Sequence, residues 1–252
     1  MRDQLRLALI AVGRYAFMLR EVFRDIVAHG VNPKELSKQI TVIGMHSLPI
    51  ILLTATFTGM VLAIQTAYGL SRFGAKNYVG NIVSLAIVRE LGPVLTAVML
   101  CGRVGAGIAA EIASMVVTEQ VDAIRALGAS PIRKLVTPRI LAAIIVVPLL
   151  VCLADLIGIY GGILIAVLEL DLTAHTYINA ILYTVIPRDL IDALCKSAVF
   201  GFLLVSIACY KGLNAKGGTE GVGLTTRAAV VTGCSVIFVS DFFLTKLLIL
   251  LN

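Results

Sequence analysis

Residues 77–118 read NYVGNIVSLAIVRELGPVLTAVMLCGRVGAGIAAEIASMVVT, and the number of times this stretch crosses a membrane decides the fold. It contains only four charged residues, and two of them stand side by side in RELGP (89–93), one residue before a glycine and a proline. As one helix the stretch would be about 60 Å long, roughly twice the thickness of the hydrocarbon layer. It can therefore form one long broken helix or two short crossings.

The composition of the whole chain is that of an integral membrane protein. Of 252 residues, 59% are hydrophobic and 14% are charged, and the mean hydropathy is +0.98. Soluble domains have about 45–50% apolar and about 25% charged residues. Four further apolar runs reach or approach the roughly 20 residues that a spanning helix needs; they are 39–71, 140–168, 193–210 and 228–251. We therefore predict an all-α integral membrane protein, with residues 1–252 forming a single domain.

The distribution of lysine and arginine decides between one crossing and two at 77–118, because basic residues concentrate in the cytoplasmic segments of membrane proteins. With one crossing and the N-terminus inside, the inner segments hold 14 basic residues and the outer segments hold 3. With two crossings the inner segments hold 8 and the outer segments 9. The prediction is five transmembrane helices, with the N-terminus in the cytoplasm and the C-terminus on the opposite side.

The N-terminal 30 residues mix apolar side chains with arginines and contain no small-residue cleavage site after an apolar core, so they are not a signal peptide. This pattern is typical of an amphipathic helix that lies flat in the membrane interface. The alternative is an ordinary cytoplasmic amphipathic helix that packs on protein.

Charged side chains inside the apolar runs are the first candidates for a functional site, because each costs several kcal/mol in hydrocarbon. Arg89 and Glu90 are adjacent and point about 100° apart on a helix, so each needs a partner on another span. We expect Glu90 to approach Lys196 and Arg89 to approach Asp241, forming a polar island in an apolar cavity. The alternative is a purely structural clasp between helices. Asp155 and Glu111 have no assigned partner.

Glycine and small residues predict a helix break and two packing surfaces. Gly92 and Pro93 should interrupt the helix after the charged pair, since proline removes a backbone donor. Small residues recur every four positions in two stripes that let another helix approach closely, within the protomer or across a homodimer; they are Gly102, Ala106, Ala110 and Ser114, and Gly158 and Gly162.

The segment 118–130, between the second and third spans, predicts a short cytoplasmic helix. Thr118 can cap its start, Glu119 and Asp122 suit its first turn, and Gly128 can end it. The sequence DAIRALG (122–128), which includes Arg125, resembles the E-A-A-x-x-x-G loop through which importer permeases dock on their ATPase subunits.

Metal, nucleotide and nucleic-acid sites are not indicated. The five cysteines and three histidines form no metal-ligand spacing. The glycine-rich stretch 215–227 lacks the GK[ST] ending of a phosphate-binding loop. No cofactor is expected on this chain, and the net charge of +6 fits membrane orientation and anionic lipid rather than nucleic acid.

Five stretches together resemble the MlaE/YrbE permease family, the membrane subunits of MCE-type ABC lipid transporters. They are GMVLAIQ (59–65), RELGPVLTAVMLCGRVGAGIAAEIASM (89–115), TEQVDAIRALGASPIRKLVTPRI (118–140), CKSAVFG (195–201) and SDFFLT (240–245). The resemblance covers nearly the whole chain after the amphipathic helix.

The resemblance implies a homodimeric permease of the bacterial inner membrane, with five spans, an interfacial N-terminal helix and a periplasmic C-terminus. Its partners would be a cytoplasmic ABC ATPase dimer that binds ATP and Mg²⁺, a periplasmic hexamer of MCE-domain protein and, in many systems, a STAS-domain protein. Its cargo would be phospholipid, moved between inner and outer membranes to maintain outer-membrane lipid asymmetry.

The resemblance also assigns roles to residues. The polar pocket carries over to Arg89, Glu90, Lys196 and Asp241. Apolar lipid contacts would fall near Leu62, Leu70 and Phe73, and the coupling helix carries over to Glu119 through Gly128, including Asp122 and Arg125.

Two alternatives of other classes remain open at this stage. One is a proton-coupled secondary transporter in which Glu90 or Asp155 carries the proton. The other is a membrane scaffold for an MCE-domain protein that transports nothing.

Overall fold

The structure, a computed structural model, describes residues 2–251 and the side chains of 9–28 and 30–250. Within that range the chain is helical and contains no strand, which confirms the predicted all-α class. The helices in chain order are α1 (Arg2–His29), α2 (Pro33–Ile43), α3 (Leu48–Ser71), η1 (Lys76–Tyr78), α4 (Val79–Ala86), η2 (Ile87–Leu91), α5 (Gly92–Leu100), η3 (Cys101–Gly105), α6 (Ala106–Val117), α7 (Gln120–Ala126), η4 (Ile132–Val136), α8 (Thr137–Leu168), α9 (Ala174–Thr184), α10 (Pro187–Leu213) and α11 (Gly218–Leu251).

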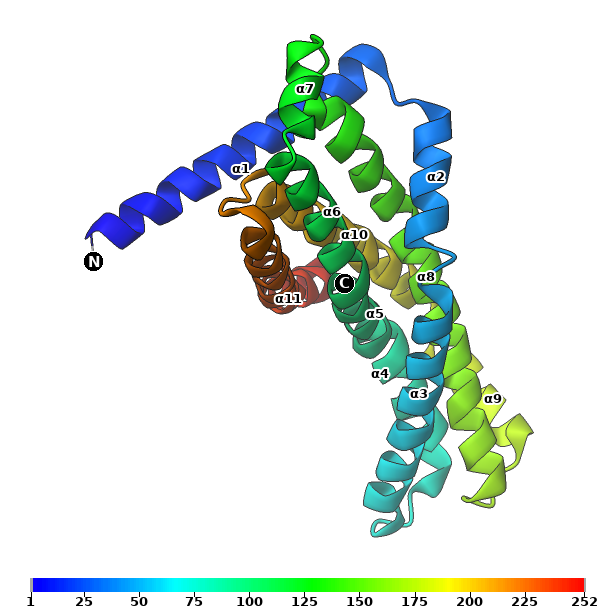
Figure 1. The fold of residues 1–252 in the computed structure, drawn as a ribbon. Coiled ribbons are helices and arrows are strands. Elements are labelled where there is room, and N and C mark those ends of the chain that lie inside the picture. The colour runs from blue at the N-terminus through cyan, green and yellow to red at the C-terminus, as the bar shows by residue number, and fades with distance from the viewer. Residues whose placement is uncertain (1, 252) are drawn as a thin grey trace.

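Five helical segments of the described chain are long and apolar enough to cross a membrane, as predicted. They are Pro33–Ser71, Lys76–Val117, Ile132–Leu168, Pro187–Leu213 and Gly218–Leu250. The second runs as one path from α4 through α5 to α6 (Figure 1). The single long segment predicted at 77–118 is therefore confirmed.

The predicted break at Gly92 and Pro93 is wrong, because the helix continues there in a wider form. Ile87–Leu91 is a π-helix, and the backbone N–H of Gly92 donates to the carbonyl oxygen of Ile87, five residues earlier. The wider turn lets Pro93, which has no N–H, enter the first turn of α5 without ending the helix. A second π-helix, Cys101–Gly105, follows ten residues later.

Among the described helices, α3 and α8 make the most extensive contact, and they lie side by side (Figure 1). A Cβ on Gly59 would overlap the carbonyl oxygen of Gly158, and a Cβ on Gly161 would come within 2.5 Å of the carbonyl oxygen of Thr56. Gly162 accommodates the hydroxyl of Tyr177 on α9. The predicted packing role of Gly158 and Gly162 within the protomer is confirmed.

The other small-residue stripe behaves differently. A Cβ on Gly102 would meet no atom within 4 Å, and Gly102 and Ser114 are exposed. These two residues therefore do not pack against another helix of the same protomer. The role of the stripe across a homodimer stays a prediction.

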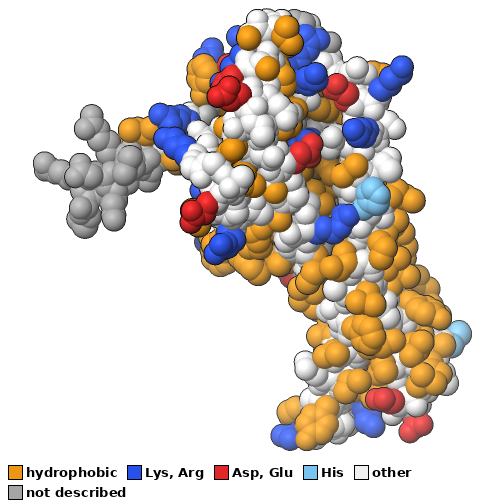
Figure 2. All heavy atoms as spheres, viewed as in Figure 1, with side chains coloured by type: hydrophobic (Ala, Val, Ile, Leu, Met, Phe, Trp, Pro, Cys, Tyr) orange, Lys and Arg blue, Asp and Glu red, His pale blue; other side chains and the backbone are white. Residues whose placement is uncertain are grey.

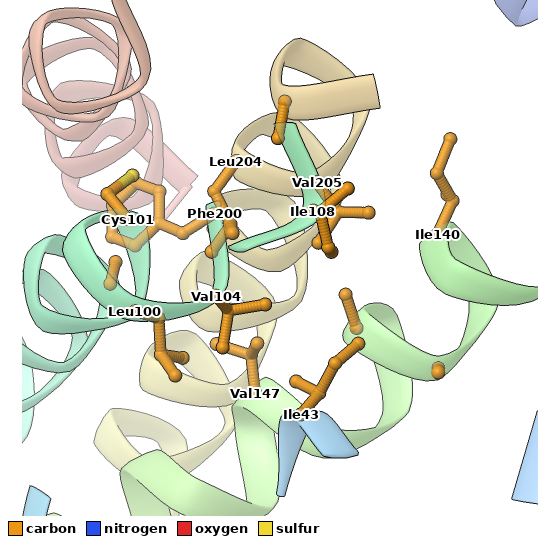
Figure 3. Packing of buried hydrophobic residues seen from close by; sticks show 14 of the residues in the cluster. Ile43, Leu100, Cys101, Val104, Ile108, Ile140, Val147, Phe200, Leu204 and Val205 are labelled. Atoms are coloured by element: carbon orange, nitrogen blue, oxygen red, sulfur yellow. The ribbon is translucent and has the colours of Figure 1, made fainter. Parts of the chain in front are cut away.

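The main hydrophobic core lies where the second span, α8 and α10 meet. Phe200, Leu204 and Val205 of α10 pack among residues of η3, α6 and α8, with Ile43 of α2 at the edge (Figure 3). On the face that Figure 2 shows, hydrophobic side chains cover the middle of the molecule and charged ones gather around α7 and the start of α2. This is the surface that a bilayer requires.

Helix α1 extends beyond the bundle (Figure 1) and has two apolar faces. Met18 and Val22 are buried in the core, and the Tyr15 hydroxyl is 2.6 Å from that of Ser206 on α10. Six large side chains along the described part of the helix remain exposed; they are Leu9, Ile10, Val12, Phe17, Phe23 and Val27. The helix both packs on protein and offers an apolar surface, as an interfacial helix would.

Candidate functional site

A cavity of about 370 Å³ opens between α4, η2, α10 and α11, and it holds three of the four residues predicted for the polar pocket. Its lining is Ile82, Leu85, Ala86, Arg89, Glu90, Asp192, Lys196, Thr245, Leu248 and Ile249. The lining is amphipathic: Arg89, Glu90, Asp192, Lys196 and Thr245 are polar or charged, and the other five residues are apolar.

Lys196 is the centre of the polar end. Its side chain is only 4% exposed, and its Nζ donates to Glu90 Oε1 at 2.9 Å and to the backbone carbonyl oxygen of Arg89 at 3.0 Å. Asp241 Oδ1 lies 3.4 Å from the same Nζ, an ion-pair contact without a hydrogen bond. The predicted pairing of Glu90 with Lys196 is confirmed, and Lys196 joins three helical segments through its charge.

The predicted pairing of Arg89 with Asp241 is wrong. Arg89 Nε donates to Asp189 Oδ1 at 2.7 Å, and Asp189 Oδ2 accepts from the backbone N–H of Ile186 at the start of α10. The side chains of Arg89 and Glu90 point in different directions from the helix, and that of Arg89 reaches the N-terminal end of α10. Asp241 instead lies next to Lys196. The Arg89 side chain stays 48% exposed and lines the cavity.

The sequence analysis missed Asp189 and Thr245. Thr245 Oγ1 donates to Glu90 Oε1 at 3.2 Å. It stands one helical turn after Asp241, so the four-residue spacing on α11 could have found it. Asp189 gave no comparable signal, because it lies in the polar segment PRDLID (187–192), which reads as a loop between spans.

Asp155 of α8, which had no predicted partner, lies against Gly92 at the end of the π-helix that carries the charged pair. Asp155 is buried, and its Oδ1 has no hydrogen-bond partner among the described residues. A Cβ on Gly92 would overlap this oxygen. Glycine in RELGP is therefore needed because a carboxylate of the third span lies against the backbone there.

The three predicted apolar contacts of the first span lie apart from this cavity, and none of them lines it. Leu62 lines a separate surface groove on α3, and Leu62 and Leu70 pack against the small core that α3, α4, α8 and α9 form. Phe73 follows the end of α3 and is 83% exposed. Within one chain the structure does not bring them to the polar residues, and their lipid contact stays a prediction.

The short helix predicted at 118–130 is present but shorter than expected. Helix α7 spans Gln120–Ala126, and Thr118 does not cap it, because the Thr118 hydroxyl donates to the carbonyl oxygen of Ser114. Glu119 precedes the helix in the left-handed conformation (φ 58°), and Gly128 (φ +76°) follows its end as predicted.

The surface of α7 is only partly covered. Val121 is buried, whereas Leu127 is 86% exposed. Asp122 and Arg125 form an exposed ion pair at 2.8 Å. A seven-residue helix with an uncovered leucine and a charged face is a surface that a partner can contact.

Glu111, which also had no predicted role, pairs with Arg139 at the start of α8 (Glu111 Oε1 to Arg139 Nη2, 2.7 Å). Arg139 is 3% exposed and Glu111 is open to the surface, so this ion pair links α6 to α8 near the end of the bundle that carries α7.

Comparison with known proteins gives a consistent family assignment. The family model described as Permease MlaE matches residues 36–247. A probable ABC transporter permease protein of Rickettsia felis is 42% identical over 94% of this chain and 92% of its own length, and one of Synechocystis is 40% identical over 92% and 88%. The chloroplastic protein TRIGALACTOSYLDIACYLGLYCEROL 1 of Arabidopsis thaliana is 36% identical over 90% of this chain and 65% of its own length.

Proposed function

Since the chain belongs to the MlaE permease family and is a multi-pass permease subunit of an ABC transporter, we propose that it moves phospholipid between the bacterial inner and outer membranes. As a permease of this class it works with a separate ATPase. The observation that carries the lipid proposal is the amphipathic cavity between α4, η2, α10 and α11.

The lining of the cavity matches the two parts of a phospholipid. Ile82, Leu85 and Ile249 offer the apolar surface that acyl chains need. Arg89 and Asp192 present opposite charges to the same space, which suits the phosphate and the amine of a zwitterionic head group. The name of the Arabidopsis relative is also that of a glycolipid, which supports lipid as the class of cargo.

A movement caused by ATP hydrolysis would be transmitted to the cavity along one continuous helical segment. Helix α7 follows α6 directly, and α6 continues through η3 and α5 to η2, which carries Arg89 and Glu90 (Figure 1). ATP-driven closure of the ATPase dimer would push on α7, and the continuous second span would transmit the displacement to the polar residues. This chain performs no covalent chemistry in the proposal.

The proposed assembly is a homodimer in the inner membrane, with the α7 end in the cytoplasm and the C-terminus in the periplasm. Its proposed partners are the ATPase dimer, a periplasmic hexamer of MCE-domain protein and a STAS-domain protein. Family membership favours this ATP-driven assembly over a proton-coupled transporter.

Purification of the complex from native membranes, followed by mass spectrometry of subunits and bound lipid, tests the proposal. We expect an ATPase, an MCE-domain protein and co-purifying phospholipid. An ATPase and MCE-domain protein without phospholipid would refute the cargo. A permease without any ATPase would return attention to a proton-coupled mechanism through Glu90, and an MCE-domain protein alone would indicate a scaffold.

Charge reversal at Asp122 tests the coupling role of α7. The ion pair with Arg125 is largely exposed, so its loss should cost less than about 1 kcal/mol of stability. We expect Asp122→Arg to insert and fold normally while lipid transfer per ATP hydrolysed falls at least tenfold in proteoliposomes. Glu169→Arg, an equal charge change just beyond the other end of α8, is the control and should retain coupling. Normal coupling in Asp122→Arg would refute the assignment of α7.

A further inference from the structure

A second, apolar groove, which shares no lining residue with the polar cavity, lies between α1, α8 and α10. Its volume is about 630 Å³. Leu19, Phe23 and Ile26 of α1 form one wall, and Leu141, Ile144 and Phe202 form the other. Arg20 is the only charged residue that lines it. In a bilayer a groove with such walls is filled by an acyl chain, because no polar solvent reaches it.

The groove lies at the level of the interface between the bilayer and water. Leu141 and Ile144 stand in the first two turns of α8, next to the end of the bundle that carries α7. Helix α1 is anchored at the same end through Tyr15 and through Ala11, whose carbonyl oxygen accepts from the Tyr210 hydroxyl at 3.0 Å. A lipid whose chain lies in the groove therefore has its head group beside α1.

Two arginines stand where that head group would lie. A shallower hollow of about 380 Å³ adjoins the groove through Arg20 and Phe23 and adds Arg24. Arg20 and Arg24 are exposed and one turn apart, whereas the acidic neighbour Asp25 is buried and Glu21 is half-buried. The exposed charges on this part of α1 are thus cationic, and guanidinium groups bind phosphate oxygens in a bidentate manner.

We propose that this groove binds one anionic phospholipid of the leaflet on which α1 lies, with an acyl chain against α8 and the phosphate between Arg20 and Arg24. The site is separate from the cargo cavity and does not depend on the nature of the cargo. A bound anionic lipid would hold α1 against α8 and α10 and fix the helix to the membrane surface. A free phosphate would leave the apolar walls unused, and a zwitterionic lipid would leave the net positive charge of the rim uncompensated.

The absence of tryptophan from the sequence gives a local measurement. Phe202→Trp introduces one fluorophore into the groove wall, and Leu141→Trp is a second reporter on α8 in the same wall. The full-length chain is reconstituted in bilayers that contain increasing fractions of lipid with brominated acyl chains, which quench a tryptophan in contact. We expect half-maximal quenching at a fraction up to about 25-fold lower for brominated phosphatidylglycerol than for brominated phosphatidylcholine, since each of the two arginines favours anionic lipid about fivefold.

Substitutions at the rim give the decisive comparison. Arg20→Gln with Arg24→Gln should remove the preference for phosphatidylglycerol at both reporters, and each single variant should weaken it. Arg14→Gln, which removes one charge from another exposed part of α1, should keep it and is the control for the single variants. Glu90→Gln in the cargo cavity should also leave the preference intact. Equal quenching by both lipids in the reporter proteins, or an equal loss in Arg14→Gln, would overturn the proposal. Relief of quenching by millimolar glycerol phosphate would show a free-anion site instead.

Discussion

Lys196→Met is expected to abolish lipid transport and to lower the free energy of unfolding by about 3–5 kcal/mol, the usual cost of breaking a buried ion pair by removing one partner. Lys196 is nearly inaccessible and is the cation that faces both Glu90 and Asp241. Methionine fills a similar volume, so the loss comes from two carboxylates left without their countercharge rather than from a cavity. Lipid transfer by the reconstituted complex and denaturant unfolding of the purified chain measure the two effects.

Two further variants separate charge from packing. Lys38→Met removes an exposed lysine of α2 and should change neither quantity measurably. Glu90→Gln combined with Lys196→Met should recover part of the stability, because the neutral amide no longer needs the ammonium group, but it should not recover transport. If the double variant were as unstable as Lys196→Met, the pairing of Glu90 with Lys196 would contribute nothing to folding.

Gly59→Ala should reduce the yield of folded protein at least as severely. The added methyl group would overlap the carbonyl oxygen of Gly158, which is backbone and cannot rotate away, so α3 and α8 would have to separate along their contact. Overpacking typically costs about 1–3 kcal/mol, and we expect roughly 3 kcal/mol or more here because the obstacle is rigid. Size-exclusion chromatography of the extracted protein and denaturant unfolding provide the readouts.

The matched control lies on the same helix. A methyl group on Gly69 meets no atom within 4 Å, so Gly69→Ala should be neutral or slightly stabilising. Equal behaviour of Gly59→Ala and Gly69→Ala would mean that the close approach of α3 to α8 is not required.

The spans and one ion pair could be predicted from the sequence, because they follow from the length, hydropathy and charge of individual segments. Hydrocarbon thickness and basic-residue counts require a certain number of crossings, and a buried Glu90 needs a cation, of which the apolar runs offer few. The partner of Arg89 could not be predicted, because Asp189 lies at a helix start beyond the apolar run and only the tertiary packing brings it near.

Backbone form was also beyond the sequence. Gly92 and Pro93 favour a break when taken alone, and the structure resolves the conflict with a π-turn because a carboxylate of α8 occupies the space beside Gly92. Likewise, Thr118 is a good capping residue, yet its hydroxyl bonds back into α6 because Glu119 takes the left-handed conformation that ends the span. In both cases tertiary contacts override local preference.

The two π-helical turns of the second span affect how many residues the span can hold as well as its shape. Each π-turn accommodates one residue more than the α-turn that it replaces, so Ile87–Leu91 and Cys101–Gly105 each act as a single-residue insertion absorbed without disturbing the flanking helix. Deletion of one residue at either π-turn would restore a regular α-turn and keep the flanking helices in phase. The same deletion in an α-helical part of the span would rotate one side against the other by about 100°. The face that reaches Lys196 and the end that leads into α7 therefore keep their register only if the residue is lost at one of the two π-turns.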